Sequence, residues 1–493
     1  MNEILNYRKL IGITNKLILN KRNSFEIHCI AFFHVIKGSE YHFKNYRFLF
    51  NKSKFILLKC ICISFLSFFK FFTKKIFNKK SKYNNSLFLD HEFDYLFVSH
   101  LVNETYLNKR VDFQFGKVPF VHKKTGMVYF NHISNFDYSK NLNLLKKFPV
   151  PIYILENKTN LCNYFKIILS VFKQSFKIFK LIKFDLNLLE IKLIIFGLIK
   201  SFSSSTLYNY VMMLEFFLLI KRTKPKFLIF TFEGQSYERV IIYAAKLADP
   251  KIKIIGYQNS PLIKNQNTLL LKFDSKFMPD EVWTSGYFCS KIVKKKLKIR
   301  TKILGSPKYI SRKQVNNYAF FNNNSKKITC LVAPEGTLSE TFMLFNFCLI
   351  YLNTYNNINF LFRLHPEINK NKLFSKFNTF NQNFTKVKFT KNKNDDFMTS
   401  DLILYRGTTL VTQAIKFGLR PLYLSLGKND LNVDPLYNYH HIWKKIIYNH
   451  HDLNTASFEK FTNSKKIIFT RKLQGFSETI LQKIDYRVIK GLK

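Results

Sequence analysis

Residues 226–261, KFLIFTFEGQSYERVIIYAAKLADPKIKIIGYQNSP, decide the fold. The apolar run 226–234 is typical of a buried strand that ends in polar residues. The segment 237–248 has the composition of a helix, which Asp249 and Pro250 end. A second buried strand follows from residue 253. A strand, a helix and another strand in this order predict a parallel sheet covered by helices on both faces.

The same alternation continues on both sides of this unit. Strands are expected at 94–101, 127–133 and 151–157 before it, and strand ends closed by glycine at 281–286 and 302–307 after it. Beyond an asparagine-rich linker at 316–325, a second set has a strand and glycine loop at 327–337, a helix at 339–355, strands at 358–367, 386–390 and 400–409, a helix at 410–419 and a strand at 420–426. Two such sets predict an α/β protein with two Rossmann-like domains. The active site should lie in the cleft between them, at the carboxyl ends of the strands.

The chain of 493 residues is long enough for two or three domains. Its ends differ from the two central sets, because they look helical and, at the start, aromatic and basic. The expected parts are a helical basic extension at 1–85, a first Rossmann-like domain at 86–315, a second at 326–445 and a helical tail at 446–493.

Charge and cysteine content limit the partners. Lys and Arg number 79 against 31 Asp and Glu, and the net charge of +48 predicts an anionic partner. Part of this charge reflects a composition rich in Lys, Asn, Ile, Phe and Tyr. Because lysine is spread along the chain and no nucleic-acid module is recognisable, no nucleic-acid partner is expected. Seven scattered cysteines without a CxxC pair favour free thiols in a reducing cytoplasm.

Two apolar segments with lysines point to a membrane surface. Residues 55–72, FILLKCICISFLSFFKFF, are interrupted by two lysines and fall short of the roughly 20 apolar residues that a membrane span needs. Within 163–200, expected to be long and helical, a polar stripe follows one helix face. Each segment fits either a buried helix or an interfacial helix on anionic lipid. We therefore expect a cytoplasmic protein, held peripherally at the inner face of the cytoplasmic membrane. The stripe consists of Lys166, Ser170, Lys173, Lys177 and Lys180.

Several familiar catalytic motifs are absent from the sequence. It contains no GxxxxGK[ST], GxGxxG, DxD or GxSxG pattern. These absences argue against P-loop enzymes, dinucleotide enzymes, metal-dependent single-domain glycosyltransferases and α/β-hydrolases. Neither a metal nor a cofactor is expected.

Polar residues at the ends of predicted strands are the remaining candidates for chemistry. In the first domain, Glu233 follows an apolar strand and is placed to act as general base toward an acceptor hydroxyl. Glu238, on the next helix, has the alternative role of capping that helix. The expected acceptor side comprises Gln235, Glu238, Gln258 and Asn259.

The second domain offers strand-end residues that suit an anion. His365 could donate a hydrogen bond to a phosphate oxygen, and Arg363 points to the same face. Threonine hydroxyls and backbone N–H groups at the start of a helix make an anion site, although a plain helix cap is the alternative. The expected nucleotide-binding residues are Glu335, Gly336, Arg363, His365, Pro366, Gly407, Thr408 and Thr409.

The order of FEG (232–234), HP (365–366) and a threonine pair (408–409) resembles that in GT-B glycosyltransferases that use CMP-activated sugars. Bacterial sialyltransferases and Kdo-type transferases carry an acidic-acidic-Gly motif, a His-Pro motif and a Ser/Thr pair. The resemblance implies that Glu233 is the base, that His365 contacts the donor phosphate and that the threonines cradle it. Phe232 stands where the first acidic residue would be.

A broader resemblance extends from about residue 94 to residue 426. The order VSHL, QFGKVP, FEGQSYE, IIGYQNS, PDEVWTSG, ILGSP, FRLHPE and GTT is similar to that in bacterial surface-carbohydrate biosynthesis proteins and capsule transferases. Those proteins often carry His where Asn259 stands. The resemblance makes 86–315 the acceptor domain and 326–445 the nucleotide-sugar donor domain.

Together these patterns predict a metal-independent glycosyltransferase. Its donor is expected to be a CMP-linked nonulosonate or Kdo, and its acceptor a glycan or glycolipid of surface polysaccharide or lipopolysaccharide. Two alternatives stay open at this point. One is a glycerophosphotransferase that uses CDP-glycerol, and the other is a catalytically inactive subunit that binds polysaccharide.

Overall fold

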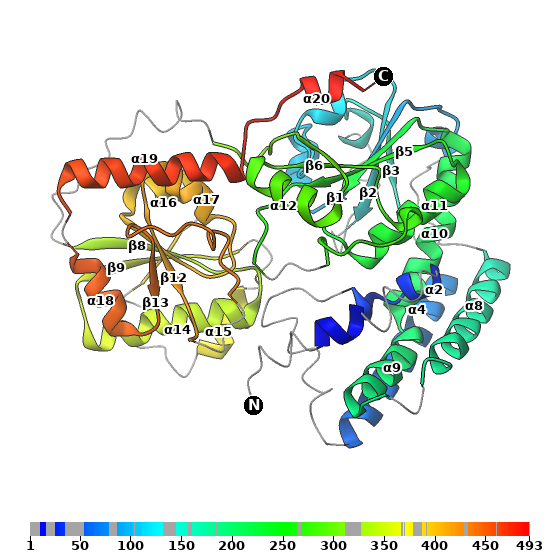
Figure 1. Cartoon of the computed structure of the whole chain (residues 1–493), viewed down its shortest axis with the longest axis horizontal. Coiled ribbons are helices and arrows are strands. Elements are labelled where there is room, and N and C mark those ends of the chain that lie inside the picture. The colour runs from blue at the N-terminus through cyan, green and yellow to red at the C-terminus, as the bar shows by residue number, and fades with distance from the viewer. Residues whose placement is uncertain are drawn as a thin grey trace.

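A computed structural model of the chain contains two parallel sheets, each covered by helices (Figure 1). The residues that it describes are 10–15, 25–34, 54–77, 86–102, 104–131, 144–155, 160–182, 186–264, 268–310, 327–365, 368, 370–377, 387–390, 392–427, 432–459 and 461–492. The linker expected at 316–325 lies outside these ranges. The expected α/β architecture with two Rossmann-like domains is confirmed.

The N-terminal domain is built on a seven-stranded sheet with the order β3-β2-β1-β4-β5-β6-β7. All pairings between neighbouring strands are parallel. The order reverses between β1 and β4, which is the point where ligands bind in sheets of this kind. The strands are β1 (Tyr95–Leu101), β2 (Thr125–Asn131), β3 (Ile152–Ile154), β4 (Phe227–Thr231), β5 (Lys253–Gln258), β6 (Glu281–Thr284) and β7 (Arg300–Ile303).

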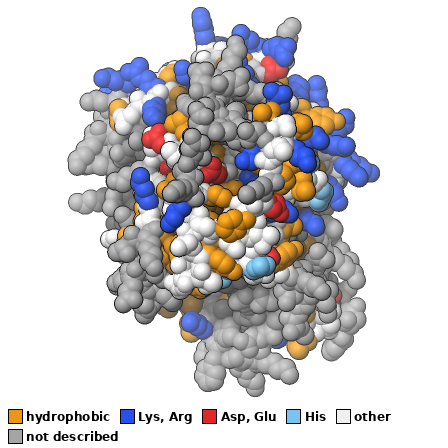
Figure 2. Space-filling model, turned by 90° about the vertical axis from the view of Figure 1, so that its left-hand side faces the viewer, with side chains coloured by type: hydrophobic (Ala, Val, Ile, Leu, Met, Phe, Trp, Pro, Cys, Tyr) orange, Lys and Arg blue, Asp and Glu red, His pale blue; other side chains and the backbone are white. Residues whose placement is uncertain are grey.

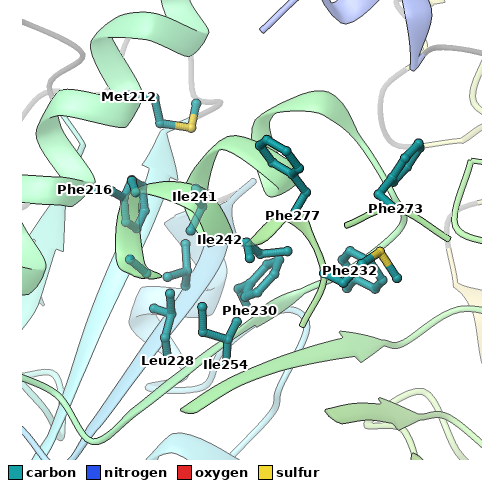
Figure 3. Close-up of a cluster of buried hydrophobic side chains, with 14 of the residues drawn as sticks. Met212, Phe216, Leu228, Phe230, Phe232, Ile241, Ile242, Ile254, Phe273 and Phe277 are labelled. Atoms are coloured by element: carbon teal, nitrogen blue, oxygen red, sulfur yellow. The ribbon is translucent and has the colours of Figure 1, made fainter. Parts of the chain in front are cut away.

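Strand β4 lies in the middle of this sheet, and all five of its residues are buried. This is why 226–234 reads as a continuous apolar run: a parallel strand covered on both faces has no polar side. Phe230 packs with apolar side chains of α10 and α11 in one core, and Ile241 and Phe216 are among them (Figure 3). The helices on this domain are α5 (Ser86–Leu89), α6 (Glu104–Asn108), η4 (Val118–Phe120), α10 (Ser204–Thr223), α11 (Ser236–Ala248), η5 (Ser275–Phe277) and α12 (Tyr287–Leu297).

The C-terminal domain is built on a six-stranded sheet with the order β10-β9-β8-β11-β12-β13, again with parallel pairings throughout. Here the order reverses between β8 and β11. The strands are β8 (Ile328–Ala333), β9 (Ile358–Arg363), β10 (Lys388–Thr390), β11 (Leu402–Tyr405), β12 (Arg420–Leu424) and β13 (Lys445–Ile447). Its helices are α14 (Leu338–Thr354), α15 (Lys370–Phe377), α16 (Lys393–Thr399), α17 (Val411–Ala414), η7 (Ile415–Phe417), α18 (His450–Phe458) and α19 (Asn463–Ile480).

The first part of the chain packs on the N-terminal domain and is not a separate arm where it is described. Leu10, Ile27, Ile30 and Phe33 are buried in the same apolar cluster as β4 and α11. A helical layer beside this domain contains elements from two distant parts of the sequence (Figure 1). The elements are α2 (Phe25–His28), η2 (Ala31–Phe33), α4 (Lys54–Phe77), α8 (Leu161–Phe179) and α9 (Leu188–Ser201).

The chain crosses between the domains twice. After α19 it returns to the N-terminal domain, where the backbone N–H of Gln482 donates to Ser285 (2.8 Å) and that of Asp485 to Leu304 (2.8 Å). The last helix, α20 (Arg487–Lys490), follows, and the Tyr95 hydroxyl donates to the carbonyl of Leu492 (2.9 Å). The end of the helical tail therefore belongs to the N-terminal domain.

Two helices differ from the sequence prediction. The helix expected over 163–200 is two helices, because Asn187 caps α9 and Glu190 completes a capping box with it. The helix expected over 410–419 consists of only four α-helical residues and a 3-10 turn, which ends at Gly418.

The basic charge is distributed widely. Figure 2 shows lysine and arginine side chains at several separate places on the left-hand face of Figure 1, with fewer aspartates and glutamates among them. Among the described side chains that Figure 2 colours, the lysines and arginines do not gather into a single patch.

Candidate functional site

Glu233 and Glu238 lie close together at the carboxyl end of β4. Glu238 is fully buried, and its carboxylate accepts hydrogen bonds from the backbone N–H groups of Glu233 (2.9 Å) and Gln235 (2.8 Å). Burial and the Glu233 charge raise the pKa of Glu238 to about 8. Glu238 therefore caps α11 and shapes the loop, and half-buried Glu233 is the carboxylate nearer to solvent.

The glycine of the FEG motif has a geometric cause. Gly234 has a φ of +81°, and a Cβ placed there would lie 2.4 Å from the carbonyl oxygen of Thr268. Any other residue would push the two loops apart and would strain the backbone. Gly234 thus fixes the direction in which Glu233 leaves the strand.

The other residues expected on the acceptor side are mostly buried. Gln235 begins α11 and is half-buried, whereas Gln258 and Asn259 are 2% and 4% exposed. The Asn259 amide donates to the side chain of Gln114 and accepts from the Ser260 hydroxyl (3.1 Å). Asn259 is therefore a buried residue that holds the neighbouring loop in place through Gln114 and Ser260.

Lys308 is a site residue that no motif indicated. It follows β7, and its ammonium donates to the Ser260 hydroxyl at 3.3 Å. Burial lowers the pKa of Lys308, and the neighbouring Glu233 carboxylate opposes this change. A cation and the candidate base thus lie together at the carboxyl edge of the first sheet.

His100 is a second residue of this kind. It lies near the end of β1, on the other side of the point where the strand order reverses. Its Nε2 is 3.3 Å from the Tyr237 hydroxyl, and its ring stacks on Phe130. Because Tyr237 follows Glu233 in the same loop and helix start, His100 borders the same site.

In the C-terminal domain, the loops after β8, β9 and β11 meet at one place. A Cβ on Gly336 would lie 2.8 Å from His365 Nδ1, so the imidazole packs directly on this loop. Gly407 has a φ of +69°, and a Cβ there would lie 2.7 Å from a carboxylate oxygen of Glu335. Four residues expected at the nucleotide site are therefore neighbours, although they are up to 72 positions apart in the sequence (407 − 335).

Thr408 and Thr409 precede a short helix, so they contribute less to anion binding than they would at the start of a long helix. The Thr408 hydroxyl accepts from the backbone N–H of Leu410 (3.3 Å), and the Thr409 carbonyl accepts from the Thr412 hydroxyl (2.7 Å). The helix that follows has four residues, so it has only a weak macrodipole. The anion-binding groups here are thus individual N–H and hydroxyl donors.

Arginine and lysine side chains complete this half of the site. Arg363 pairs with Asp396 (2.6 Å) and still has further N–H donors in its guanidinium. Lys393, also missed by sequence, donates to the Gln413 side chain (3.1 Å), and burial together with Arg363 lowers its pKa. Arg406 is almost fully buried and pairs with Glu340 (2.9 Å), which ties the loop after β11 to α14.

The two halves of the site are connected directly. The Gln413 amide, which lies beyond the loop 406–410, donates to the backbone carbonyl of Lys308 (2.9 Å). The carboxyl edges of the two sheets therefore face each other at the position of Lys308. Pro366 lies outside the described residues.

Across the parts of the chain that the structure describes, no three His, Cys, Asp or Glu residues are grouped so that they could hold a metal ion. Nor does any helix within the same ranges have the length and apolar content of a membrane-spanning segment.

Comparisons with known proteins add little beyond the fold. No family model and no curated protein sequence matches the chain. Among solved structures, it is similar to UDP-GlcNAc 2-epimerase from Methanocaldococcus jannaschii, with 12% identity over 77% of this chain and 99% of that one and a TM-score of 0.40. It is also similar to MurG from Acinetobacter baumannii (11% identity, 78% and 99% coverage, TM-score 0.39) and to HepE from Anabaena in complex with UDP and glucose (8%, 81% and 97%, TM-score 0.42).

The class rests on the chain itself: two parallel sheets of Rossmann type, with facing carboxyl edges and a C-terminal segment that returns to the first domain. This is the GT-B arrangement.

Proposed function

We propose that the chain is a metal-independent GT-B glycosyltransferase that moves a sugar from a CMP-linked donor to a surface-carbohydrate acceptor. The observation that carries the proposal is the contact between Lys308 and Gln413. This contact joins the loop that carries Lys308, beside Glu233, to the C-terminal domain, and it supports a site shared by the two domains.

Glu233 is the proposed general base. It is half-buried, lies at the point where the strand order reverses, and its backbone is fixed by Gly234 and by Glu238. A base held in this way needs no reorganisation before it takes the proton of an acceptor hydroxyl. Lys308 provides a positive charge beside this carboxylate.

The C-terminal half is the proposed nucleotide site. His365 and the backbone around Gly336 face the donor phosphate, and Thr408 and Thr409 add hydroxyl groups. The Glu335 carboxylate accepts hydrogen bonds, so it suits a ribose hydroxyl better than a phosphate. The donor sugar in this proposal is a nonulosonate or Kdo, and the acceptor is a glycan or glycolipid.

We further propose that the protein acts in the cytoplasm, peripherally at the inner face of the cytoplasmic membrane, in capsule or lipopolysaccharide assembly. The free cysteines of the sequence and the lysine-bearing apolar helices support this location.

The test separates the role of a general base from the role of a nucleotide-binding residue. Glu233→Gln should keep CMP affinity but lower turnover about 10²–10⁴-fold, because the general base is lost. His365→Ala should weaken CMP binding as well as turnover. Both are measured by calorimetric titration with CMP and by transfer from a panel of CMP-sugars and CDP-glycerol.

The opposite pattern, with CMP binding abolished by Glu233→Gln and intact in His365→Ala, would reverse the roles and contradict the proposal. Transfer from CDP-glycerol alone would establish the glycerophosphotransferase instead. If the chain binds no nucleotide and transfers no group from either kind of donor, it would be the catalytically inactive subunit that binds polysaccharide.

A further inference from the structure

Helix α4 exposes large apolar side chains while it buries Phe68 and Ser64. Ser64 is 1% exposed and lies against Lys200 of α9, whose ammonium donates to it (3.3 Å). Ser67 accepts from the backbone N–H of Ser204 (3.4 Å) and also faces inward. Leu66 and Phe69, in contrast, are 69% and 59% exposed. A helix packed for water would place these residues the other way round.

Helix α8 is apolar on two faces. One face, with Ile167, Val171 and Ile178, is buried against the domain. A second face is exposed and aromatic, and each of its residues is more than half exposed. This second face consists of Phe165, Leu169, Phe172, Phe176 and Phe179.

The two exposed faces form one surface. Phe65 of α4 stacks on Phe202 (centroids 5.2 Å apart), and Phe172 of α8 meets the same ring edge-on (5.3 Å). Phe202, at the end of α9, thus joins apolar side chains that lie a hundred residues apart in the sequence. We call this the Phe/Lys surface; its described apolar members are Ile63, Phe65, Leu66, Phe69, Phe165, Leu169, Phe172, Phe176, Phe179 and Phe202.

The charges on this surface have one sign. Lys59 and Lys70 are exposed on α4, and Lys166, Lys173 and Lys180 are exposed along the phenylalanine stripe of α8. Neither helix contains a single aspartate or glutamate in its sequence. An apolar surface on two helices whose charged residues are all lysines matches a partner that is apolar inside and anionic at its boundary.

We propose that the Phe/Lys surface docks on anionic phospholipid bilayers, with the phenylalanines in the interface and the lysines at the headgroups. This rests on the membrane location of the proposed function and names the surface that provides it. Neither helix spans the bilayer, since lysines interrupt both apolar faces.

The experiment is co-sedimentation of the full chain with vesicles of phosphatidylcholine, with and without phosphatidylglycerol as the anionic lipid. Binding should require the anionic lipid. Replacing Lys166, Lys173 and Lys180 by Glu should lower partitioning at least about 100-fold, since each lysine near an anionic surface contributes roughly fivefold. The matched control, Lys123→Glu with Lys124→Glu and Lys146→Glu, makes the same charge change at exposed sites elsewhere and should lose far less.

A second set tests the apolar component. Phe165→Gln, Phe172→Gln and Phe176→Gln together should weaken binding by at least about tenfold, because each buries apolar area in the interface. Leu247→Gln, Ile442→Gln and Phe458→Gln change exposed apolar residues elsewhere and should leave binding intact.

Equal binding to neutral vesicles, or equal losses in the variants and their controls, would overturn the proposal. A second result would also overturn it: the chain binds no vesicle but forms a dimer in analytical ultracentrifugation, and the phenylalanine variants dissociate that dimer. The Phe/Lys surface would then be a contact between two copies. CMP titration of the same variants keeps the two proposals separate, because the Phe/Lys surface should not affect nucleotide affinity.

Discussion

The regions around β4 and around β11 bury titratable groups in different ways. Near β4, Glu238 lies beside the like charge of Glu233, and burial lowers the pKa of Arg239 to about 10. Two buried histidines, His28 and His34, have no hydrogen-bond partner among the described residues for any ring nitrogen. Around β11 the charges are paired, as in Arg406 with Glu340 at 2.9 Å and Lys444 with Asp434.

This difference separates two tasks. Burial shifts the proton affinities of Glu238 and Arg239 near β4, which suits the side of the site proposed for proton transfer. Paired groups keep their charges over a wide pH range and hold loops in place, which suits a rigid anion site. The comparison predicts that removing one partner near β11 costs stability, whereas neutralising a carboxylate near β4 costs little.

The largest effect expected is for Glu340→Gln. It leaves Arg406 as a buried charge without its carboxylate, and such a loss typically costs about 3–5 kcal/mol. Glu238→Gln should cost only about 1 kcal/mol, because a carboxyl with a pKa of about 8 is already mostly neutral at pH 7 and the amide keeps an oxygen that can accept the loop N–H groups. Urea unfolding of both variants at pH 7 measures the difference. Equal losses would contradict the comparison.

Lowering the pH below 6.5 should destabilise the region around β4. Burial lowers the pKa of His28 well below its usual value, with smaller contributions from His34, Arg239 and Lys276. Burial and Arg239 lower the pKa of His34 to about 3. Below pH 6.5 the unfolded chain binds protons that the folded chain does not, so stability falls as pH decreases. Each histidine contributes about 1.4 kcal/mol per pH unit below 6.5.

Thermal unfolding between pH 7 and pH 5 measures this slope, and His34→Gln should reduce the histidine part by about half. His440, exposed on the C-terminal domain, is the matched control, and His440→Gln should leave the slope nearly unchanged. A chain with no loss of stability over this range would show that the two rings are hydrated.

A medium effect is expected for Gly336→Ala. The new Cβ would lie 2.8 Å from His365 Nδ1 and must displace the imidazole. If His365 contacts the donor phosphate, CMP affinity should fall about tenfold, the value of one hydrogen bond to a charged group. Gly475→Ala is the control, because nothing lies within 4 Å of its Cβ position in α19. That variant should gain stability and bind CMP normally.

The smallest effect is expected for Thr408→Ala. Its hydroxyl accepts one backbone hydrogen bond, so its loss should cost roughly 1 kcal/mol of stability. CMP affinity should change by no more than about threefold, since backbone N–H groups remain in the loop. A loss as large as that of His365→Ala, measured in the same titration, would make Thr408 a principal phosphate contact.

The sequence predicts best what depends on strand ends. Glu335, His365 and Gly407 each follow a strand of the second sheet, and the carboxyl ends of parallel strands share one edge, so their grouping follows from the alternation alone. Glu233 is placed in the same way at the edge of the first sheet. The sequence does not decide which of Glu233 and Glu238 is the general base and which caps the helix, because both roles need a carboxylate at a helix start. Only the bonds to the loop N–H groups distinguish the two.

Lys308 and Lys393 could not be found in this way. Each is one lysine among many, and its place in the site depends on a contact between domains or on burial beside an arginine. The shortness of α17 was missed because 410–419 is apolar enough for a longer helix, whereas its residues in fact fill the space beneath β11 and α19.

The return of residues 481–492 to the first domain has a consequence for synthesis. Ile489 and Leu492 belong to the apolar cluster of β1 and β2, and Tyr95 and Leu304 bond to this same segment. A ribosome makes the chain from its amino end, so the first sheet emerges long before the segment that completes its core. The second domain can be assembled while the first still lacks its last apolar side chains. The core of the N-terminal domain is thus completed only after the C-terminal domain has been synthesised. A chain that stops before residue 481 lacks the apolar side chains that complete the core of its first domain.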